Sequence, residues 1–292
     1  MTDIFPWIFR SLNAYIVTTP WAAVRKPLKV LFLVSAYFRS LSLKRLKGKP
    51  TWCVINNFDR NIKLKIDRSR DMGASFFWTG FHELREFIFL HRFLKNEMTA
   101  LDVGANLGEY TLFMAKRLTS GRVLSFEPMA EVRSQLSENV KLNHFRNVDI
   151  FEFGLSNKKQ KLTLHEVDDG NEGLGTLYLG EKKSKRSVEV TLEALDEKWA
   201  SFHLDRLDFM KVDVEGSELF VLQGGREIIA QFRPLILLEV SNENFKAAGY
   251  SASGIAAFFT TLNYSACQLN KDGQPEPCNA LPSFGNVLFV PQ

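Results

Sequence analysis

Acidic side chains end several apolar runs of this sequence, an arrangement that indicates a ligand-binding edge of a sheet. Asp102 ends the run ALD, Glu127 ends LSFE, and Asp213 ends FMKVD. Runs that are apolar along most of their length are typical of parallel strands covered by helices on both faces. Because the carboxyl ends of parallel strands meet at one edge, we expect these carboxylates to surround one site.

The turn after Asp102 is expected to hold part of a ligand. Gly104 and Gly108 lie in VGANLGEY with Asn106 between them, and glycine lets the backbone approach a ligand closely. The sequence lacks both the dinucleotide fingerprint G-x-G-x-x-G and the phosphate loop G-x-x-x-x-G-K-[ST]. An acid before the turn is also a poor neighbour for a pyrophosphate, so a nucleoside triphosphate is not expected here.

Glu127 follows the glycine turn by about one β-α-β repeat, where a carboxylate can accept hydrogen bonds from both hydroxyls of a ribose. NAD and S-adenosylmethionine both carry a free ribose diol. A sulfonium and an ammonium group favour nearby acids whereas a pyrophosphate does not, so Asp102 favours S-adenosylmethionine. The alternative interpretation is that both acids only cap helices and form turns.

The segment FMKVDVEGSE carries the candidates for catalysis. Lys211 and Asp213 alternate on a strand and share one side, and Glu215 follows in the loop that opens the next helix. Asp213, or else Glu215, is expected to orient a substrate hydroxyl or remove its proton, which typically contributes about 10²–10⁴-fold. Lys211 would hold an oxyanion, or act as the base if burial lowers its pKa. The alternative is that Lys211 and Asp213 pair with each other and that Glu215 serves the helix N-terminus.

Glu239 ends the apolar run LILLE and is expected to face the same edge. Together with Asp213 and Glu215 it could bind a divalent cation, and oxygen ligands suit Mg²⁺. Such an ion would lower the pKa of the substrate hydroxyl. The three cysteines are odd in number and show no metal-ligand spacing, which indicates neither a disulfide framework nor a zinc site and favours a reducing, cytoplasmic compartment.

Alternating strands and helices would position these residues in a doubly wound, mostly parallel sheet. Strands are predicted at 98–103, 122–127, 148–153, 207–212 and 235–240, and helices at 108–118, 130–143 and 217–231. Two further strands, YSACQLN and GNVLFVP, are predicted near the end, the second antiparallel at or near the sheet edge. The polar stretch from about 156 to 190 is predicted to be an inserted hairpin followed by a loop.

Residues 1–50 are predicted to form a basic, amphipathic helical arm before a domain of residues 51–292, whose first strands form a hairpin. The arm contains nine Lys or Arg and one acid, so its net charge is +8, whereas the remaining 28 basic and 32 acidic residues give −4. A body of that sign is a poor nucleic-acid binder. Residues 1–48 could lie on an anionic membrane surface, or the arm could pack on the body or on a partner subunit.

Four segments together resemble the FkbM family of S-adenosylmethionine-dependent methyltransferases: LDVGANLGEYTLFMA, LSFEPMAEVRSQLSENVKLN, FMKVDVEGSELFVLQGG and RPLILLEVS. The resemblance covers about residues 81–291 and implies a class I methyltransferase fold, Rossmann-like, with seven strands and the last reversed. It also implies O-methylation of a sugar or a polyketide-like natural product. The cofactor residues that it implies are Asp102, Gly104, Asn106 and Gly108 around the methionine moiety, Glu127 at the ribose, Pro128 beneath the adenine, and Leu155 and Ser156 at its boundary.

The function predicted from the sequence is therefore an S-adenosylmethionine-dependent O-methyltransferase that acts on a sugar, a glycan or a related natural product. Because the arm is basic and rich in aromatic residues, the acceptor could lie near the inner face of a membrane. Two alternatives stay open at this point. One is an NAD-dependent oxidoreductase on a Rossmann-like fold, and the other is a non-catalytic, membrane-associated scaffold.

Overall fold

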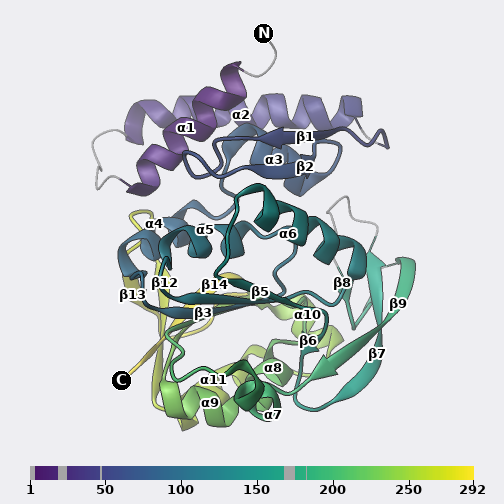
Figure 1. Cartoon of the computed structure of the whole chain (residues 1–292), viewed down its shortest axis with the longest axis vertical. Coiled ribbons are helices and arrows are strands. Elements are labelled where there is room, and N and C mark those ends of the chain that lie inside the picture. Colours follow the sequence, from purple (N-terminus) through teal and green to yellow (C-terminus); the bar gives the residue numbers. More distant parts are fainter. Residues whose placement is uncertain (1–3, 19–24, 47, 168–174, 182) are drawn as a thin grey trace.

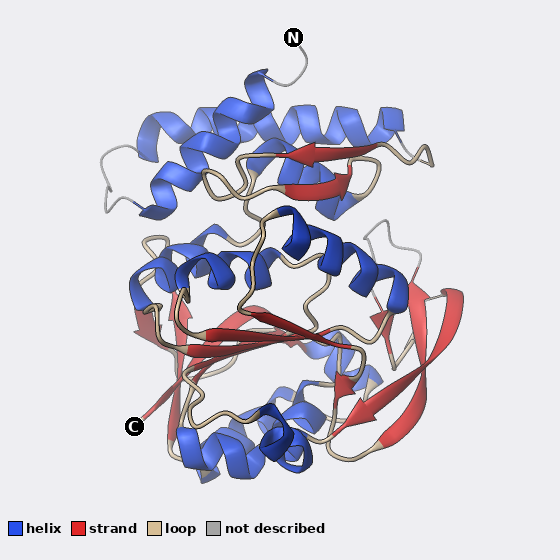
Figure 2. Ribbon diagram, in the orientation of Figure 1, coloured by secondary structure: helices blue, strands red, loops and turns tan. Residues whose placement is uncertain are grey.

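The computed structural model describes residues 4–18, 25–46, 48–167, 175–181 and 183–292, without the side chains of residues 25–33. Figure 1 shows an N-terminal layer of two helices and a hairpin above a central sheet that has helices on both sides. A second, smaller sheet lies at one end of the central sheet (Figure 2).

In the described part of the chain, the central sheet has eight strands in the order β13-β12-β14-β11-β10-β3-β4-β5. The strands β3, β4, β5, β10 and β11 are parallel, and β14 runs antiparallel between β11 and β12. Without the short edge strand β13, this is the seven-stranded class I order with the last strand reversed. The strands are β3 (Thr99–Val103), β4 (Arg122–Phe126), β5 (Val148–Phe151), β10 (Phe209–Val212), β11 (Leu235–Ser241), β12 (Tyr264–Leu269), β13 (Pro275–Pro277) and β14 (Phe284–Pro291).

Alternate residues of the parallel strands enter two different hydrophobic cores, which is why these strands are apolar on both faces. Phe209 and Leu237 belong to one core, and their neighbours Met210 and Leu238 belong to the other. The helix predicted at 217–231 is two helices, because Gly225 ends one and begins the next. The helices of the domain are α4 (Leu84–Phe93), α5 (Glu109–Arg117), α6 (Ala130–Leu142), α7 (Leu195–Lys198), the 3₁₀ helix η1 (Trp199–Phe202), α8 (Glu218–Gly224), α9 (Arg226–Phe232), α10 (Asn242–Ala247) and α11 (Ala252–Thr261).

The predicted insertion forms a sheet of its own, in the order β6-β9-β7-β8. Its strands are β6 (Gly154–Leu155), β7 (Gln160–Val167), β8 (Gly175–Thr176) and β9 (Ser184–Glu193). The strands β7 and β9 pair antiparallel, which confirms the hairpin. Part of the loop predicted there, residues 168–174 and 182, lies outside the described residues.

The N-terminal layer consists of α1 (Ile4–Thr18), α2 (Arg25–Leu46), the antiparallel hairpin β1 (Trp52–Ile55) and β2 (Leu64–Asp67), and a helix that the sequence analysis did not predict, α3 (Asp71–Thr79). The α1 helix packs on the body, because the buried Arg10 donates hydrogen bonds to Asn57 Oδ1 (2.6 Å) and to the Phe77 carbonyl. The domain boundary at residue 50 stays a prediction. Among the described helices, none is both long and apolar enough to cross a bilayer.

Candidate functional site

A cavity of about 580 Å³ lies at the carboxyl ends of β3, β4, β10 and β11, within the size range of small-molecule sites. Most of the residues predicted from the sequence line it: Asp102, Gly104, Asn106, Glu127, Pro128, Leu155, Lys211, Asp213, Glu215 and Glu239. Gly108 and Ser156 are not among the described lining residues. Gly108 instead caps the start of α5, and Ser156 is buried with its backbone N–H bonded to the Glu193 carbonyl.

The glycine turn is packed between two strands. Gly104 has a φ of +83°, and a methyl group added there would lie 1.9 Å from the carbonyl oxygen of Asp213. The backbone N–H groups of Gly104 and Ala105 both donate to the Phe126 carbonyl. This turn therefore needs glycine for the approach of β10 as well as for any ligand that it holds.

Glu127 ties the end of β4 to the glycine turn. Its Oε2 accepts a hydrogen bond from the Asn106 backbone N–H (3.1 Å), and its Oε1 accepts one from that of Met129 (2.9 Å). Burial raises the pKa of Glu127 to about 7, against the opposing effect of these two bonds. Each carboxylate oxygen has two lone pairs, so both oxygens can accept another hydrogen bond. The carboxylate fits the ribose diol of a nucleoside cofactor.

Asp102 lies beneath the turn and is 1% exposed. Its Oδ2 accepts a hydrogen bond from the Thr111 hydroxyl (2.6 Å), which also contacts the Ser125 hydroxyl (2.7 Å). Burial raises the pKa of Asp102, while the charge of Lys211 and the bond from Thr111 lower it. These contacts fix the carboxylate at the donor end of the cavity, where the cationic part of S-adenosylmethionine would be attracted to it.

Lys211 and Asp213 form an ion pair, with 2.6 Å between Nζ and Oδ2. The ammonium also lies 4.5 Å from the centre of the Tyr110 ring. Burial alone would lower the pKa of Lys211. The carboxylates of Asp213, Glu83 and Asp102 outweigh this effect, so the pKa lies above its ordinary value. Lys211 therefore stays protonated, which argues against its predicted role as a base and leaves the role of holding an oxyanion.

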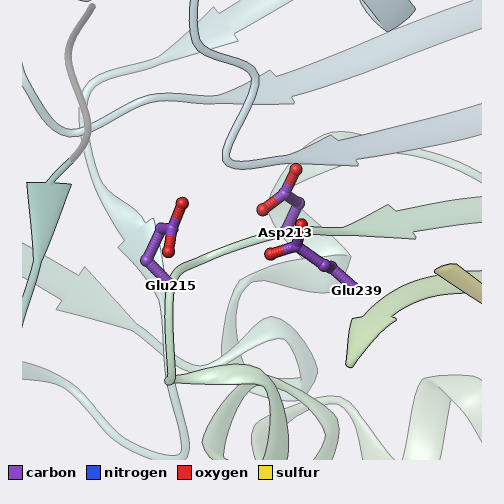
Figure 3. A group of neighbouring side chains, drawn as sticks. All are labelled: Asp213, Glu215 and Glu239. Carbon is purple, nitrogen blue, oxygen red and sulfur yellow. The ribbon is translucent and has the colours of Figure 1, made fainter. Parts of the chain in front are cut away.

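Asp213, Glu215 and Glu239 converge, as Figure 3 shows, and each offers a carboxylate oxygen within 4.8 Å of the others. Burial, together with the charges of Asp213 and Glu215, raises the pKa of Glu239 to about 10. Glu215 has a left-handed φ of 53°, a costly conformation that is common at functional sites. Its Oε2 accepts a hydrogen bond from Asn244 (2.8 Å), which orients the carboxylate.

The sequence analysis missed residues that position this group. The Glu218 carboxylate accepts hydrogen bonds from the backbone N–H groups of Val214 and Gly216 and from the Tyr250 hydroxyl (3.1–3.3 Å), so it holds the loop that carries Glu215. Its place directly after the N-cap Ser217 was a signal, because an acid in the first turn of a helix is attracted to the unpaired backbone N–H groups at the helix start.

Glu83 was also missed, and no local spacing indicated it. It accepts hydrogen bonds from the Tyr110 hydroxyl and from the Asn286 amide (2.5 Å each) and lines the cavity. Its partners lie 27 and 203 residues away in the sequence. Only the folded chain brings these groups together.

Residues 102–266 match the protein family described as "Methyltransferase FkbM domain". The chain belongs to the FkbM methyltransferase family. This match covers more than half of the chain and begins at Asp102, one of the acids that line the cavity. The FkbM domain is an S-adenosylmethionine-dependent methyltransferase domain, so the predicted enzyme class and methyl donor are confirmed. An NAD-dependent oxidoreductase is thereby excluded.

Curated relatives match the FkbM region in part. Methyltransferase sdnD of Sordaria araneosa is 31% identical over 152 residues, which cover 42% of this chain and 59% of sdnD. Methyltransferase 1 of Beauveria bassiana is 28% identical over 144 residues, or 42% of this chain and 57% of that protein. The AMB antimetabolite synthetase AmbE of Pseudomonas aeruginosa is 25% identical over 197 residues, 56% of this chain and 9% of AmbE. The chain thus spans less than three fifths of each of these relatives.

A solved FkbM methyltransferase from Methylobacillus flagellatus is 15% identical, with a TM-score of 0.45 over 67% of this chain and 44% of that one. The structure of TYW2 from M. jannaschii in complex with AdoMet is 14% identical, with a TM-score of 0.42 over 84% of this chain and 86% of that one. Because both TM-scores are below 0.5, we assign the class I fold from the strand order of this chain and not from these structures.

Proposed function

We propose that this FkbM-family protein transfers the methyl group of S-adenosylmethionine to a hydroxyl of a sugar, a glycan or a related natural product. One observation carries the proposal. The carbonyl of Asp213 lies against Gly104 in the donor turn, and its carboxylate lies in the group with Glu215 and Glu239. An acceptor hydroxyl that contacts this carboxylate is therefore next to the donor turn.

The reaction that these residues support is an in-line displacement. The bound donor supplies a methyl group already activated on a sulfonium. As the acceptor oxygen forms its bond to the methyl carbon and the carbon–sulfur bond breaks, Asp213 accepts the hydroxyl proton. The ion pair with the Lys211 ammonium holds the Asp213 carboxylate in place for this step. Otherwise the site contributes mainly by holding donor and acceptor in line.

Binding of the donor can be tested by calorimetry with S-adenosylmethionine. Glu127→Gln replaces one carboxylate oxygen, a hydrogen-bond acceptor, by an amide N–H₂, which can only donate. The amide would then face a backbone N–H or a ribose hydroxyl without accepting its hydrogen bond, so we expect the affinity for S-adenosylmethionine to fall about 10–100-fold. Glu197→Gln, at an exposed site outside the cavity, should bind as the wild type does. Absent binding to the wild type would refute the donor assignment, and an unchanged Glu127→Gln affinity would refute the ribose contact.

We also propose that Asp213, Glu215 and Glu239 bind Mg²⁺. Three converging carboxylates offer the oxygen ligands that Mg²⁺ prefers, and the ion would favour ionisation of an acceptor hydroxyl held beside it. Burial and the charges of Asp213 and Glu215 oppose ionisation of Glu239 and raise its pKa. A bound cation would offset this repulsion among the three carboxylates.

Glu239→Gln should have opposite effects with and without Mg²⁺. Mg²⁺ should raise the thermal unfolding midpoint of the wild type and of Glu243→Gln, an acid that lines the cavity outside the group, but not that of Glu239→Gln. In EDTA at pH 8 the variant should be more stable than the wild type. Folding raises the pKa of Glu239 from 4.5 to about 10, so the wild type loses stability as the pH rises between these values, whereas glutamine does not ionise. An equal Mg²⁺ response in all three proteins would exclude this site.

We further propose that the N-terminal helices contact the cytoplasmic face of a membrane. They combine the basic charge of residues 1–50 with exposed apolar side chains, many of them aromatic, as interfacial helices do. In the described part of α1 and α2, the exposed large apolar residues are Ile4, Phe5, Trp7, Ile8, Tyr15, Val34, Tyr37, Phe38 and Leu41.

Vesicle sedimentation tests this contact. Because α1 packs on the body, we favour a surface variant, Phe5→Ser with Trp7→Ser and Tyr37→Ser, over deletion of the arm. The wild type should sediment with vesicles rich in anionic phosphatidylglycerol and much less with neutral phosphatidylcholine vesicles, and the variant should stay in the supernatant. Equal sedimentation of variant and wild type would contradict the interfacial role.

A further inference from the structure

The helices α2 and α3 form part of the wall of the methyltransferase cavity. The described residues that they contribute are Arg39, Asp71, Met72, Ser75 and Phe76. All five lie outside the 102–266 segment that matches the FkbM domain. The N-terminal layer is therefore part of the active site and not only an arm.

Acidic side chains outnumber basic ones in this cavity, and burial raises the pKa of several of them, such as Glu127 and Glu239. Its acidic lining residues are Asp71, Glu83, Asp102, Glu109, Glu127, Asp213, Glu215, Glu239 and Glu243. Of the described lining residues, Arg39 and Lys211 are the only Lys or Arg. An anionic group on an acceptor needs a cation to compensate its charge, and these two side chains are the candidates among the described lining residues.

The two cations differ in what they already contact. Lys211 is bound to Asp213 and lies over the Tyr110 ring. The guanidinium of Arg39 donates to the neutral hydroxyl of Ser75 (2.5 Å) and, within the described residues, forms no salt bridge. A guanidinium has five N–H donors in a planar fork that suits bidentate binding of phosphate or carboxylate. Arg39 has donors left for such a group, whereas the charge of Lys211 is compensated.

We propose that Arg39 and the adjoining face of α3 form an acceptor subsite that binds an anionic group, a phosphate or a carboxylate, on the molecule to be methylated. The inference rests on the proposed methyl transfer and names the acceptor class. Asp71 lies one turn before Ser75 on the same face of α3 and limits the anion to the Arg39 side. Met72, which is only partly buried, offers apolar contact to the adjoining part of the acceptor, and the uncharged hydroxyl of the acceptor reaches Asp213.

Anion binding by the full-length protein saturated with S-adenosylhomocysteine tests this subsite. The probes are inorganic phosphate, glucose 1-phosphate and glucuronate, with glucose as the neutral comparison, each titrated at constant ionic strength and followed by ligand-observed NMR. We expect at least one anionic probe to bind more tightly than glucose. Arg39→Gln should weaken that binding about tenfold or more, and Arg39→Lys should weaken it less. Lys44→Gln, the same charge change at an exposed position of α2, should have no effect.

The results separate the subsite from the proposed function. A preference for glucose 1-phosphate indicates a phosphate ester, and a preference for glucuronate indicates a carboxylate. Unchanged anion binding in Arg39→Gln, an equal loss in Lys44→Gln, or no anion binding at up to roughly 20 mM, where millimolar affinity would be visible, overturns the subsite. Affinity for S-adenosylmethionine, measured by calorimetry on the same proteins without S-adenosylhomocysteine, stays normal if only the subsite is wrong and is absent in the wild type if the methyltransferase proposal is wrong.

Discussion

Gly104→Ala is expected to unfold the protein or to destabilise it severely, and to abolish binding of S-adenosylmethionine. The added methyl group would lie 1.9 Å from the carbonyl oxygen of Asp213, on the backbone of the neighbouring strand, where no side chain can move aside. Its φ of +83° adds the cost of a left-handed residue. Overpacking and backbone strain together should cost about 3 kcal/mol or more.

Gly249→Ala separates these two costs. Gly249 also has a φ of +83°, but nothing lies within 4 Å of the added methyl group. It should therefore lose only the conformational part, about 1–2 kcal/mol, and keep donor binding. Urea unfolding and calorimetry on both variants test the prediction. Equal stability losses would show that the contact between the turn and β10 is not tight.

Asp213→Asn should lower the rate of methyl transfer by about 10²–10⁴-fold, because an amide cannot accept the hydroxyl proton. Donor affinity should change much less, since the proposed cofactor contacts come from the ends of β3 and β4. The variant also leaves the buried Lys211 ammonium without its paired carboxylate, which destabilises the fold, so the unfolding midpoint must be measured at the same time.

The assay is incorporation of labelled methyl groups from S-adenosylmethionine into a cell extract. Asp205→Asn, an exposed acid outside the cavity, is the matched control and should transfer at the wild-type rate. Normal transfer by a folded Asp213→Asn protein would remove Asp213 as the base and favour Glu215. No transfer by the wild type in extracts of several sources would favour the non-catalytic scaffold.

The donor half of the site could be predicted from the sequence because its parts are local. Asp102 and Glu127 each end an apolar strand, and parallel strands bring their ends together without further information. The same logic found Asp213 and Glu239, whose strands β10 and β11 are adjacent. The strand β14 was predicted to be antiparallel, but its place between β11 and β12 depends on pairings that no local pattern encodes.

The wall that we propose for acceptor binding could not be predicted, because it is assembled from residues far apart in the sequence. Glu83 joins the cavity through partners that only tertiary packing selects, and Arg39 belongs to a helix that the sequence analysis assigned to a separate arm. The helix α3 was missed because DMGASFFWT is short and contains a glycine, so its helical pattern is weak.

The close contact between Gly104 and the Asp213 carbonyl fixes, through the main chain, the distance between the turn that we propose for the donor and the proposed proton acceptor. Surface side chains can change without altering it. The α2–α3 wall is contributed by an earlier stretch of the chain, and its residues Phe76 and Phe77 share a hydrophobic core with α4 and α5, so an exchanged stretch must keep these core contacts. We expect chimeras of this kind to methylate a different acceptor while the contact between Gly104 and the Asp213 carbonyl stays the same.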